Sequence, residues 1–372
     1  MKRAKGKQSI NRTVPDIPAR YLSIILILLF VVFGPIASAE QANKLEARDS
    51  WREIQLVLDT RDYSWCGNKQ VVFSGDGIVN GKGIRLYDLD SGVVQNITND
   101  SSHENVSCTA DGRYIVFTDK TSINKQGSLF VYDRNTRTMK KVYEMEGTLL
   151  SIISRSMPLS PHANYLLGPD LPSVRQYILP GGKEVKLIPY RRGMSQDPEF
   201  RKLQWAYDES RLFLFDSNGG RLNIRDLKEN YDRNFYFRIK DFWLRDMHVT
   251  KDNKFYVDAL SDGEIDDEGI SNLYRFDLAD PDKHGHLVVS NIGEYDADAE
   301  GNVVFERQST KDGSFRHSIY YLERGKKEAQ ILKEISVSSF GIGLRISSNG
   351  RGIIFFMPTA KRTREFKILI KK

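Results

Sequence analysis

The chain has 372 residues, of which 40% are hydrophobic, 11% aromatic and 28% charged. These values are ordinary for a folded globular protein and exclude a wholly disordered chain. The formal net charge of +6 is concentrated in residues 1–39, since residues 40–372 carry 49 basic against 48 acidic side chains. Without that segment the basic excess disappears, so charge argues against a nucleic-acid-binding protein.

The first 39 residues have the three parts of an export signal. Basic residues precede an apolar stretch over 21–33, and the small-residue site Ala37-Ser38-Ala39 follows. We expect a cleaved signal peptide over 1–39, a linker over 40–50 and a periplasmic or secreted protein. The alternative is an uncleaved anchor, because the apolar stretch approaches the roughly 20 residues that span a bilayer. The protein would then be membrane-anchored and would face the periplasm.

A two-part pattern recurs along residues 51–372. In each copy a turn pair such as Asp-Gly precedes a short apolar run, and a second strand-like run follows it. The pair supplies a positive-φ turn between antiparallel strands, and the apolar run is typical of a strand buried on both faces. Seven copies occur, with first apolar runs at Val71–Phe73, Tyr114–Phe117, Tyr165–Leu167, Leu212–Phe215, Phe255–Val257, Val303–Phe305 and Ile353–Phe356.

The repeat predicts the fold class. A sheet with two apolar faces cannot remain alone in water, and radial packing of several such sheets buries both faces. We expect an all-β protein, a single β-propeller over 51–372 with seven blades, or six if the degenerate third copy merges with a neighbour. The run Ile54–Leu58 has no partner of its own, and the last copy ends after its third strand. We therefore expect this N-terminal strand to complete the last blade and close the ring.

The best-preserved copy carries a family resemblance. Cys108–Phe117 followed by Leu129–Asp133 resembles the WD40-like repeats of TolB-type propellers, in which a Ser-Pro-Asp-Gly-like turn precedes an apolar strand. The resemblance implies a β-propeller in an exported, bacterial-type setting that binds another macromolecule at one face. TolB itself carries an α/β domain before its propeller, for which residues 40–50 are too few, so the resemblance does not imply the TolB role.

Catalytic motifs are sparse. No Gly-x-Ser-x-Gly nucleophile elbow is present, and we predict no catalytic residue, no metal and no cofactor. Propeller lyases that act on acidic sugars hold a metal with channel histidines, and His103 and His248 are the two placed for such a role. A metal-assisted carbohydrate-active enzyme is therefore the alternative function. Asp296–Gly301 resembles the start of a calcium loop, but Arg307 stands where the twelfth-position glutamate is required.

Cys66 and Cys108 are the two cysteines of the chain. Both precede the inner strands of successive copies, which would place them on neighbouring blades. In an exported protein they could form a disulfide, and two buried thiols are the alternative.

The segments that enter the inner strands should line one opening of the channel, because equivalent positions of a radial repeat share a face. Their mixture of arginine and aromatic residues is typical of a binding surface. We expect a monomeric, non-catalytic propeller that binds a protein or peptide partner of the cell envelope at its rim or channel mouth. Membrane contact would occur only through a retained N-terminal segment. The residues expected at the mouth are Tyr63, His103, Asn105, Arg155, Arg201, Trp205, Arg245, Asp246, His248 and Arg345.

Overall fold

The structure is a computed structural model of the chain. It describes residues 50–58, 62–76, 82–119, 126–146, 159–170, 173–179, 183–189, 200–216, 221–229, 231–236, 242–261, 271–279, 285–311, 314–337, 342–358 and 364–372. The expected signal peptide or anchor lies outside these residues. The described residues belong to one compact unit, Ser50–Lys372, and each named element in them is a β-strand. No helix in this part of the chain is long and apolar enough to cross a membrane.

The strands form six four-stranded sheets and one three-stranded sheet, all antiparallel. The first sheet contains β2 (Tyr63–Cys66), β3 (Gln70–Asp76), β4 (Lys82–Asp88) and β5 (Val94–Asn96). The second contains β6 (His103–Cys108), β7 (Tyr114–Asp119), β8 (Gln126–Asp133) and β9 (Thr138–Glu146). The third contains β10 (Tyr165–Asp170), β11 (Ser173–Ile178) and β12 (Lys183–Pro189). The fourth contains β13 (Phe200–Trp205), β14 (Arg211–Asp216), β15 (Arg221–Asp226) and β16 (Tyr231–Tyr236).

The remaining three sheets follow the same order along the chain, except that β1 joins the last one. The fifth contains β17 (Phe242–Val249), β18 (Lys254–Ser261), β19 (Ser271–Asp277) and β20 (His286–Ile292). The sixth contains β21 (Tyr295–Ala297), β22 (Val303–Lys311), β23 (Ser314–Leu322) and β24 (Gln330–Val337). The last contains β25 (Leu344–Ile346), β26 (Gly352–Pro358), β27 (Arg364–Lys371) and β1 (Trp51–Leu58).

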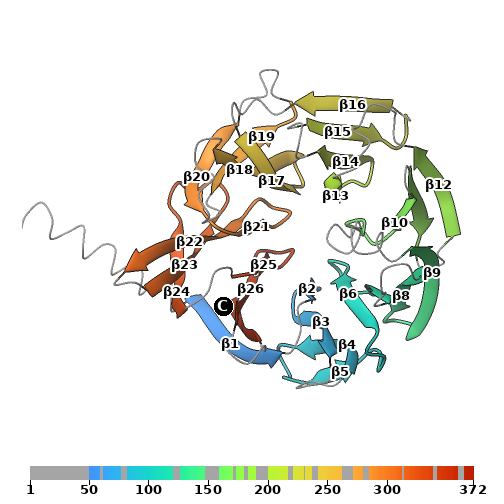
Figure 1. The fold of residues 1–372 in the computed structure, drawn as a ribbon, viewed down its shortest axis with the longest axis horizontal. Helices are drawn as coiled ribbons and strands as arrows, with labels where there is room; N and C mark the ends of the chain where they lie inside the picture. The colour runs from blue at the N-terminus through green and yellow to red at the C-terminus, as the bar shows by residue number, and fades with distance from the viewer. Residues whose placement is uncertain are drawn as a thin grey trace, which may run out of the picture. The chain divides into compact units, whose positions relative to one another are not determined.

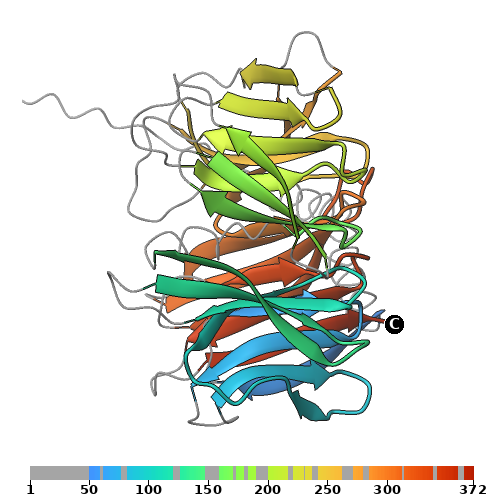
Figure 2. The ribbon, with the colours of Figure 1, turned by 90° about the vertical axis from the view of Figure 1, so that its right-hand side faces the viewer.

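The sheets follow one another around a central axis (Figure 1), and their strands run roughly along that axis (Figure 2). The first strand of each four-stranded sheet lies innermost and the fourth lies at the outside. This radial arrangement defines a β-propeller. The all-β propeller fold predicted from the repeat is confirmed.

Buried phenylalanines hold neighbouring sheets together. Each four-stranded sheet has one on the strand next to its innermost strand, and each is at most 1% exposed. Burial of such a side chain stabilises the fold by about 1.5–3 kcal/mol. Phe213 and Phe255 belong to successive sheets and meet edge to face, with ring centroids 5.0 Å apart. The six residues are Phe73, Phe117, Phe213, Phe255, Phe305 and Phe355.

The turn that precedes each of these buried strands has a common geometry. Every sheet has one residue with positive φ there, as the Asp-Gly-like pairs predicted. In six of the sheets its N–H donates to the carbonyl oxygen three residues earlier, as from Gly112 to Thr109 at 2.9 Å. The positive-φ residues are Gly67, Gly112, Ala163, Glu209, Asn253, Gly301 and Gly350.

The third sheet is the degenerate copy of the repeat. Where the other sheets have an innermost strand, this sheet has a single β-bridge between Leu159 and Leu166. Its turn is nevertheless regular, because Ser160 Oγ accepts from the N–H of Tyr165 at 2.9 Å. The copy therefore keeps the turn and three of the four strands.

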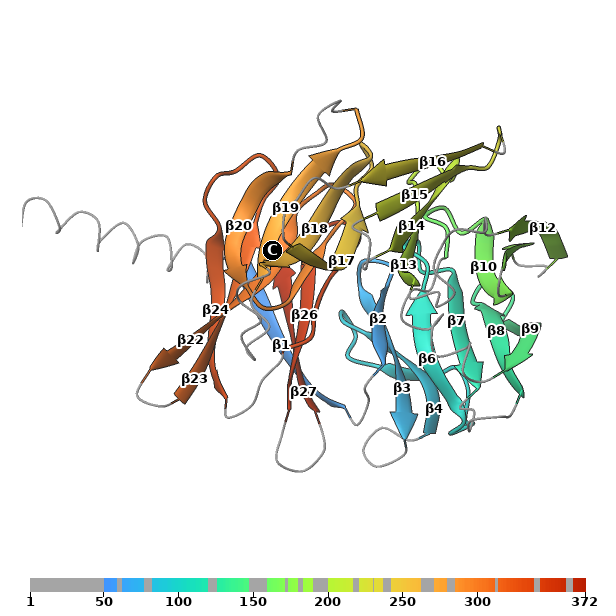
Figure 3. The ribbon, with the colours of Figure 1, turned by 45° about the horizontal axis from the view of Figure 1, so that its top comes forward.

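The N-terminal strand β1 pairs with the C-terminal strand β27. The antiparallel register runs from Trp51 opposite Lys371 to Leu58 opposite Arg364. Figure 3 shows β1 beside β26 and β27, within the part of the ring formed by the end of the chain. The Trp51 ring also meets Tyr321 of the sixth sheet edge to face at 5.4 Å, so β1 contributes to the packing between two sheets.

A disulfide joins Cys66 at the end of β2 to Cys108 at the end of β6, with Cα atoms 5.0 Å apart. Cys66 is 1% exposed and packs in the cluster between the first and second sheets. The bond therefore crosses the boundary between two sheets that also meet through side-chain packing and through the N–H of Asn105, which donates to Asp62 Oδ2 at 3.4 Å.

The disulfide closes a segment whose ends are 42 residues apart. We expect the double variant Cys66→Ala, Cys108→Ala to lower the free energy of unfolding by about 2–4 kcal/mol, because the unfolded chain is no longer cross-linked. Denaturant unfolding of the oxidised protein, the reduced protein and the double variant measures this. Equal stability of all three would contradict the expected role of the bond.

Candidate functional site

A cavity of about 810 Å³ opens at the end of the ring where the innermost strands finish. We call it the mouth cavity. It is on the same face as the C-terminus labelled in Figure 2, since the N–H of Lys371 donates to Arg351 in the turn before β26. Six of the seven sheets contribute to it. Its lining residues are Ala110, Asp111, Leu159, Pro161, His162, Gln204, Trp205, Tyr207, His248, Val249, Lys251, Ala297, Ala299, Glu300, Ser348 and Asn349.

The shared turn explains why these residues meet. The turn residues that precede the positive-φ position stand at the same end of every sheet, facing the axis. Ala110, Pro161, Tyr207, Lys251, Ala299 and Ser348 all occupy the first of these positions. Their side chains are therefore free of the sheet pairing and project from rigid, hydrogen-bonded turns. The side chains at these turn positions can differ from sheet to sheet without altering the packing of the core.

One wall of the mouth cavity carries a chain of contacts from four successive sheets. The rings of His162 and Tyr207 meet edge to face with centroids 5.0 Å apart. Lys251 Nζ lies 4.7 Å from the Tyr207 ring centroid and also forms an ion pair with Glu300. The hydrogen bond to Glu300 is the main cause of a raised Lys251 pKa. We call these four residues the mouth wall.

His248 on β17 lies between two carboxylates, that of Asp246 on the same strand and that of Asp296 on the neighbouring inner strand β21. Its Nε2 is 3.2 Å from Asp296 Oδ1 and 3.8 Å from Asp246 Oδ2. Its ring meets Tyr295 edge to face at 5.1 Å. The second carboxylate oxygen of Asp296 accepts the N–H of Ile346 at 2.8 Å, which ties the fifth, sixth and last sheets together.

Arg345 lies on the innermost strand β25, close to the same carboxylates. Arg345 is exposed on this strand. Desolvation lowers the Arg345 pKa, but Tyr63, Asp296 and Asp246 outweigh it, so the pKa is raised. The inner strands thus carry a compact set of opposite charges beneath the mouth cavity.

The donor set does not fit a metal ion. In the described part of the chain there is no group of three or more His, Cys, Asp or Glu side chains placed to hold one. His248 and Asp296 instead satisfy each other, and Asp296 also accepts a backbone N–H. The calcium-like segment Asp296–Gly301 covers the end of β21 and the turn before β22, where Asp298 accepts from the N–H of Asn302 at 2.8 Å.

Four of the ten residues expected at the mouth are near it. Trp205 and His248 line the mouth cavity, and Trp205 also stacks on Tyr165 with ring centroids 5.7 Å apart. Asp246 and Arg345 lie on the inner strands. Asp246 is next to His248, and Arg345 is close to the carboxylates of Asp246 and Asp296.

Three others have structural roles elsewhere. Tyr63 packs edge to face on Phe366 at 4.9 Å and donates to Gly343 at 3.2 Å. His103 is 7% exposed, its ring packs on Phe117 at 4.7 Å, and burial lowers its pKa. Asn105 adopts a φ of 56° in an irregular part of β6 and donates from its side chain to Thr118 at 2.9 Å.

The remaining three cannot be placed at the mouth. Arg155 lies outside the described residues, as do the side chains of Arg201 and Arg245, whose backbones are in β13 and β17. The direction of the innermost strands explains why some expected residues lie near the mouth and others do not. Innermost strands run in one direction, so residues that begin a strand, such as His103, lie at the opposite end from residues that finish one, such as His248.

The mouth wall was missed because turn residues were interpreted as connections between strands. The sequence does contain the relevant pattern. Within each copy, the residues just before the positive-φ position vary widely, from Ala110 to Tyr207 and Lys251, while the flanking apolar strand stays constant. Variation at a fixed place on a repeated turn is typical of a binding surface on a rigid scaffold.

No family model matches the chain, and no curated protein matches its sequence. Solved structures match its fold. An oligogalacturonate lyase in complex with manganese matches with a TM-score of 0.60 at 10% identity, over 86% of this chain and 91% of the other. The β-propeller domain of the trilobed protease from Pyrococcus furiosus matches with a TM-score of 0.54 at 14% identity, over 83% and 92% of the chains.

The WD40 repeats of RRP9 match with a TM-score of 0.52 at 13% identity, over 86% of this chain and 97% of the other. These proteins share little sequence with this chain, so the likeness extends to the β-propeller fold alone. A fold of WD40 type agrees with the repeat seen in the sequence. The narrower resemblance to TolB-type propellers stays a prediction.

Proposed function

We propose that this protein is an exported, non-catalytic β-propeller that binds a peptide segment of a cell-envelope protein in its mouth cavity. The observation that carries the proposal is the mouth wall, in which His162, Tyr207, Lys251 and Glu300 come from four successive sheets. Aromatic rings with adjacent charges on rigid turns offer contact area at a low cost in conformational entropy. In this proposal the protein is a monomer and lies in the periplasm or the medium, with a retained N-terminal anchor as the alternative.

A peptide suits the remaining lining of the cavity. The amide oxygens of Gln204 and Asn349 accept hydrogen bonds within the protein, so their amide N–H groups are the ones offered to peptide C=O groups. The Ser348 hydroxyl donates to Asn68 and can still accept a peptide N–H. Trp205 and Leu159 supply apolar surface in the same cavity. A cavity of about 810 Å³ is within the range of roughly 300–1,000 Å³ that is typical of ligand sites.

Site-specific photocrosslinking tests the proposal. We expect a photoreactive residue at position 207 to form a covalent adduct with one defined envelope protein in living cells. Position 236 is the matched control, because Tyr236 is 51% exposed on β16 of the same sheet but lies away from the mouth. Mass spectrometry of the adducts identifies the protein and the crosslinked peptide.

The same adduct should decrease at least about tenfold when Lys251→Ala is added, since charged contacts contribute about 1.5–3 kcal/mol each. Lys333→Ala, which removes a charged contact to Glu53 away from the mouth, should leave the adduct unchanged. The mouth cavity would not be the binding site if the adduct were equally abundant from positions 207 and 236. The same holds if its abundance did not change in Lys251→Ala.

A metal-assisted carbohydrate-active enzyme is the second candidate. The observation that favours it is the position of His248 and Asp296 at and beneath the mouth cavity, although the donor set does not fit a metal and His103 lies elsewhere. We expect purified protein to yield no unsaturated product from oligogalacturonate, with or without added Mn²⁺, as measured by ultraviolet absorbance. Product formation that is lost in His248→Ala would replace the binding proposal with the enzymatic one.

We also propose that the ring has seven blades and that β1 closes it. Support comes from the seven positive-φ turns, which include that of the three-stranded sheet, and from the pairing of β1 with β27. The core cluster that joins Phe73 of the first sheet to Phe366 of the last supports closure independently.

Removal of β1 tests closure. We expect deletion of residues 51–60 to abolish cooperative thermal unfolding of the whole domain, because it exposes the edge of β27 and uncovers apolar side chains of the last two sheets. Deletion of residues 41–49 is the control and should leave the melting temperature unchanged. Unchanged melting after removal of 51–60 would contradict closure by β1.

A further inference from the structure

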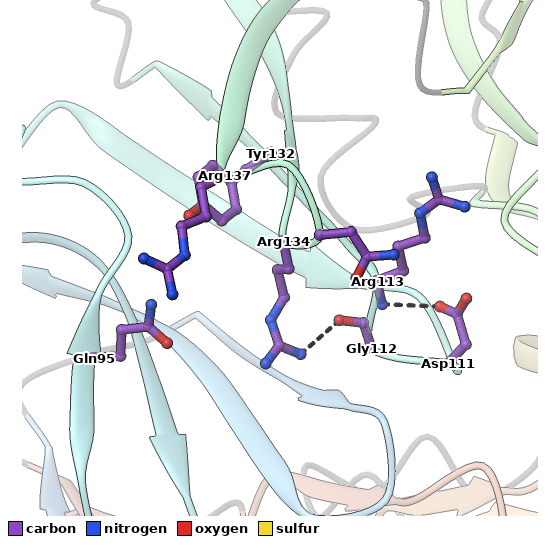
Figure 4. A pocket seen from close by; sticks show the side chains of 8 residues that line it. Gln95, Asp111, Gly112, Arg113, Tyr132, Arg134 and Arg137 are labelled. Atoms are coloured by element: carbon purple, nitrogen blue, oxygen red, sulfur yellow. Dashed lines mark hydrogen bonds between the residues drawn. The ribbon is translucent and has the colours of Figure 1, made fainter.

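A second cavity, of about 430 Å³, lies between the first and second sheets. It lies on the face of the mouth cavity, because Asp111 lines both. Figure 4 shows its side chains. They come from β5, from the turn before β7, from the end of β8 and from the turn between β8 and β9. The lining residues are Gln95, Asp111, Gly112, Arg113, Tyr132, Arg134, Asn135 and Arg137.

The three arginines of this cavity differ in how their charge is compensated. Arg113 Nη2 forms an ion pair with Asp133 at 3.3 Å, and this contact raises its pKa. No described carboxylate forms an ion pair with Arg134 or Arg137. The carboxylate of Asp111 also lines the cavity, where its Oδ1 accepts from Thr109 Oγ1 and from the backbone N–H of Arg113. The cavity therefore presents two guanidinium groups whose charge no described carboxylate pairs.

Arg134 is held in place from the protein side. Its Nη1 donates to the carbonyl oxygen of Gly112 at 2.6 Å. Burial lowers the Arg134 pKa, opposed by Tyr132, Asp88 and Asp111, which reflects a charged group taken partly out of water. A partly desolvated cation gains more from an anionic ligand than a fully hydrated one.

The backbone of Arg137 is held by the turn that carries it. Asp133 Oδ1 accepts the N–H of Asn135 at 2.9 Å at the start of the turn, and Arg137 ends the turn with a φ of 56°. An arginine in the left-handed region is unusual and costs energy. Figure 4 shows the guanidinium groups of Arg134 and Arg137 on the same side of the cavity, toward Gln95, whereas that of Arg113 points away.

We propose that Arg134, Arg137 and Gln95 form a site for a phosphate monoester group, which we call the arginine pocket. Two guanidinium groups without an ion-pair partner among the described residues match the charge of a dianion, and their planar forks match the oxygens of a phosphate. The amide groups of Gln95 and Asn135 add N–H donors at the same cavity. The proposal concerns a separate site and does not rest on peptide binding at the mouth wall.

Calorimetric titration of the purified protein with glycerol 3-phosphate tests the site. We expect one molecule to bind, and binding to weaken about tenfold between pH 7.5 and pH 5, because the second phosphate pKa is near 6 and arginine does not titrate in this range. Arg137→Ala should weaken binding at least about tenfold, and Arg137→Lys less, since lysine keeps the charge without the fork. Arg137 is exposed, so neither variant should alter thermal unfolding.

Arg52→Ala is the matched control, because Arg52 is an exposed arginine on β1, away from the pocket. This variant should bind glycerol 3-phosphate as the parent protein does. Succinate distinguishes a phosphate site from a general dicarboxylate site and should bind more weakly. The proposal is overturned by an absence of glycerol 3-phosphate binding, by equal affinity in Arg137→Ala, or by succinate binding as tightly as the phosphate ester without pH dependence. Each of these results would leave photocrosslinking at position 207 unaffected.

Discussion

Among the described residues, six core clusters each join two neighbouring sheets, so the apolar faces of the sheets are buried against one another. The rest of the architecture depends on this constraint. The fourth and fifth sheets share one core cluster, and the first and last sheets share another through Phe73 and Phe366. Since β1 pairs with β27 in the last sheet, which packs on the first, neighbouring sheets support one another, and no single sheet has to be stable alone.

This packing separates the parts of the sequence that must stay apolar from the parts that are free to differ. The strands fill the core, while the turns before the buried strands stand at one end of the ring with their backbone groups already hydrogen-bonded. Side chains far apart in sequence, such as His162 and Glu300, thereby line one cavity. The arginine pocket follows from the same geometry at the boundary of two sheets, where the disulfide also lies.

The repeat was readable from the sequence because its evidence is local. A turn with positive φ followed by an apolar run such as Ile115–Phe117 needs no knowledge of distant contacts, and the structure has a strand at each predicted place. The site was harder to predict because it depends on the direction of the innermost strands. His103 and His248 both looked like residues of the inner strands, yet one begins a strand and is buried while the other ends one at the mouth.

Some features had no local evidence at all. The partners of Lys251 come from the neighbouring sheets, and only the spatial order of the repeats brings Tyr207 and Glu300 to it. Arg134 and Arg137 are close in sequence, but their lack of a carboxylate partner among the described residues is a property of the packed turn. The site was therefore hard to predict because its residues are far apart in the sequence and meet only in the folded protein.

The central claim is that the turns of successive sheets together form a binding mouth. A crystal structure of the protein with the peptide identified by crosslinking tests it most directly. We expect the peptide to lie across the mouth cavity in contact with Tyr207 and Lys251. A peptide bound along the outer strands, or at the opposite end of the ring beside Tyr63, would contradict it.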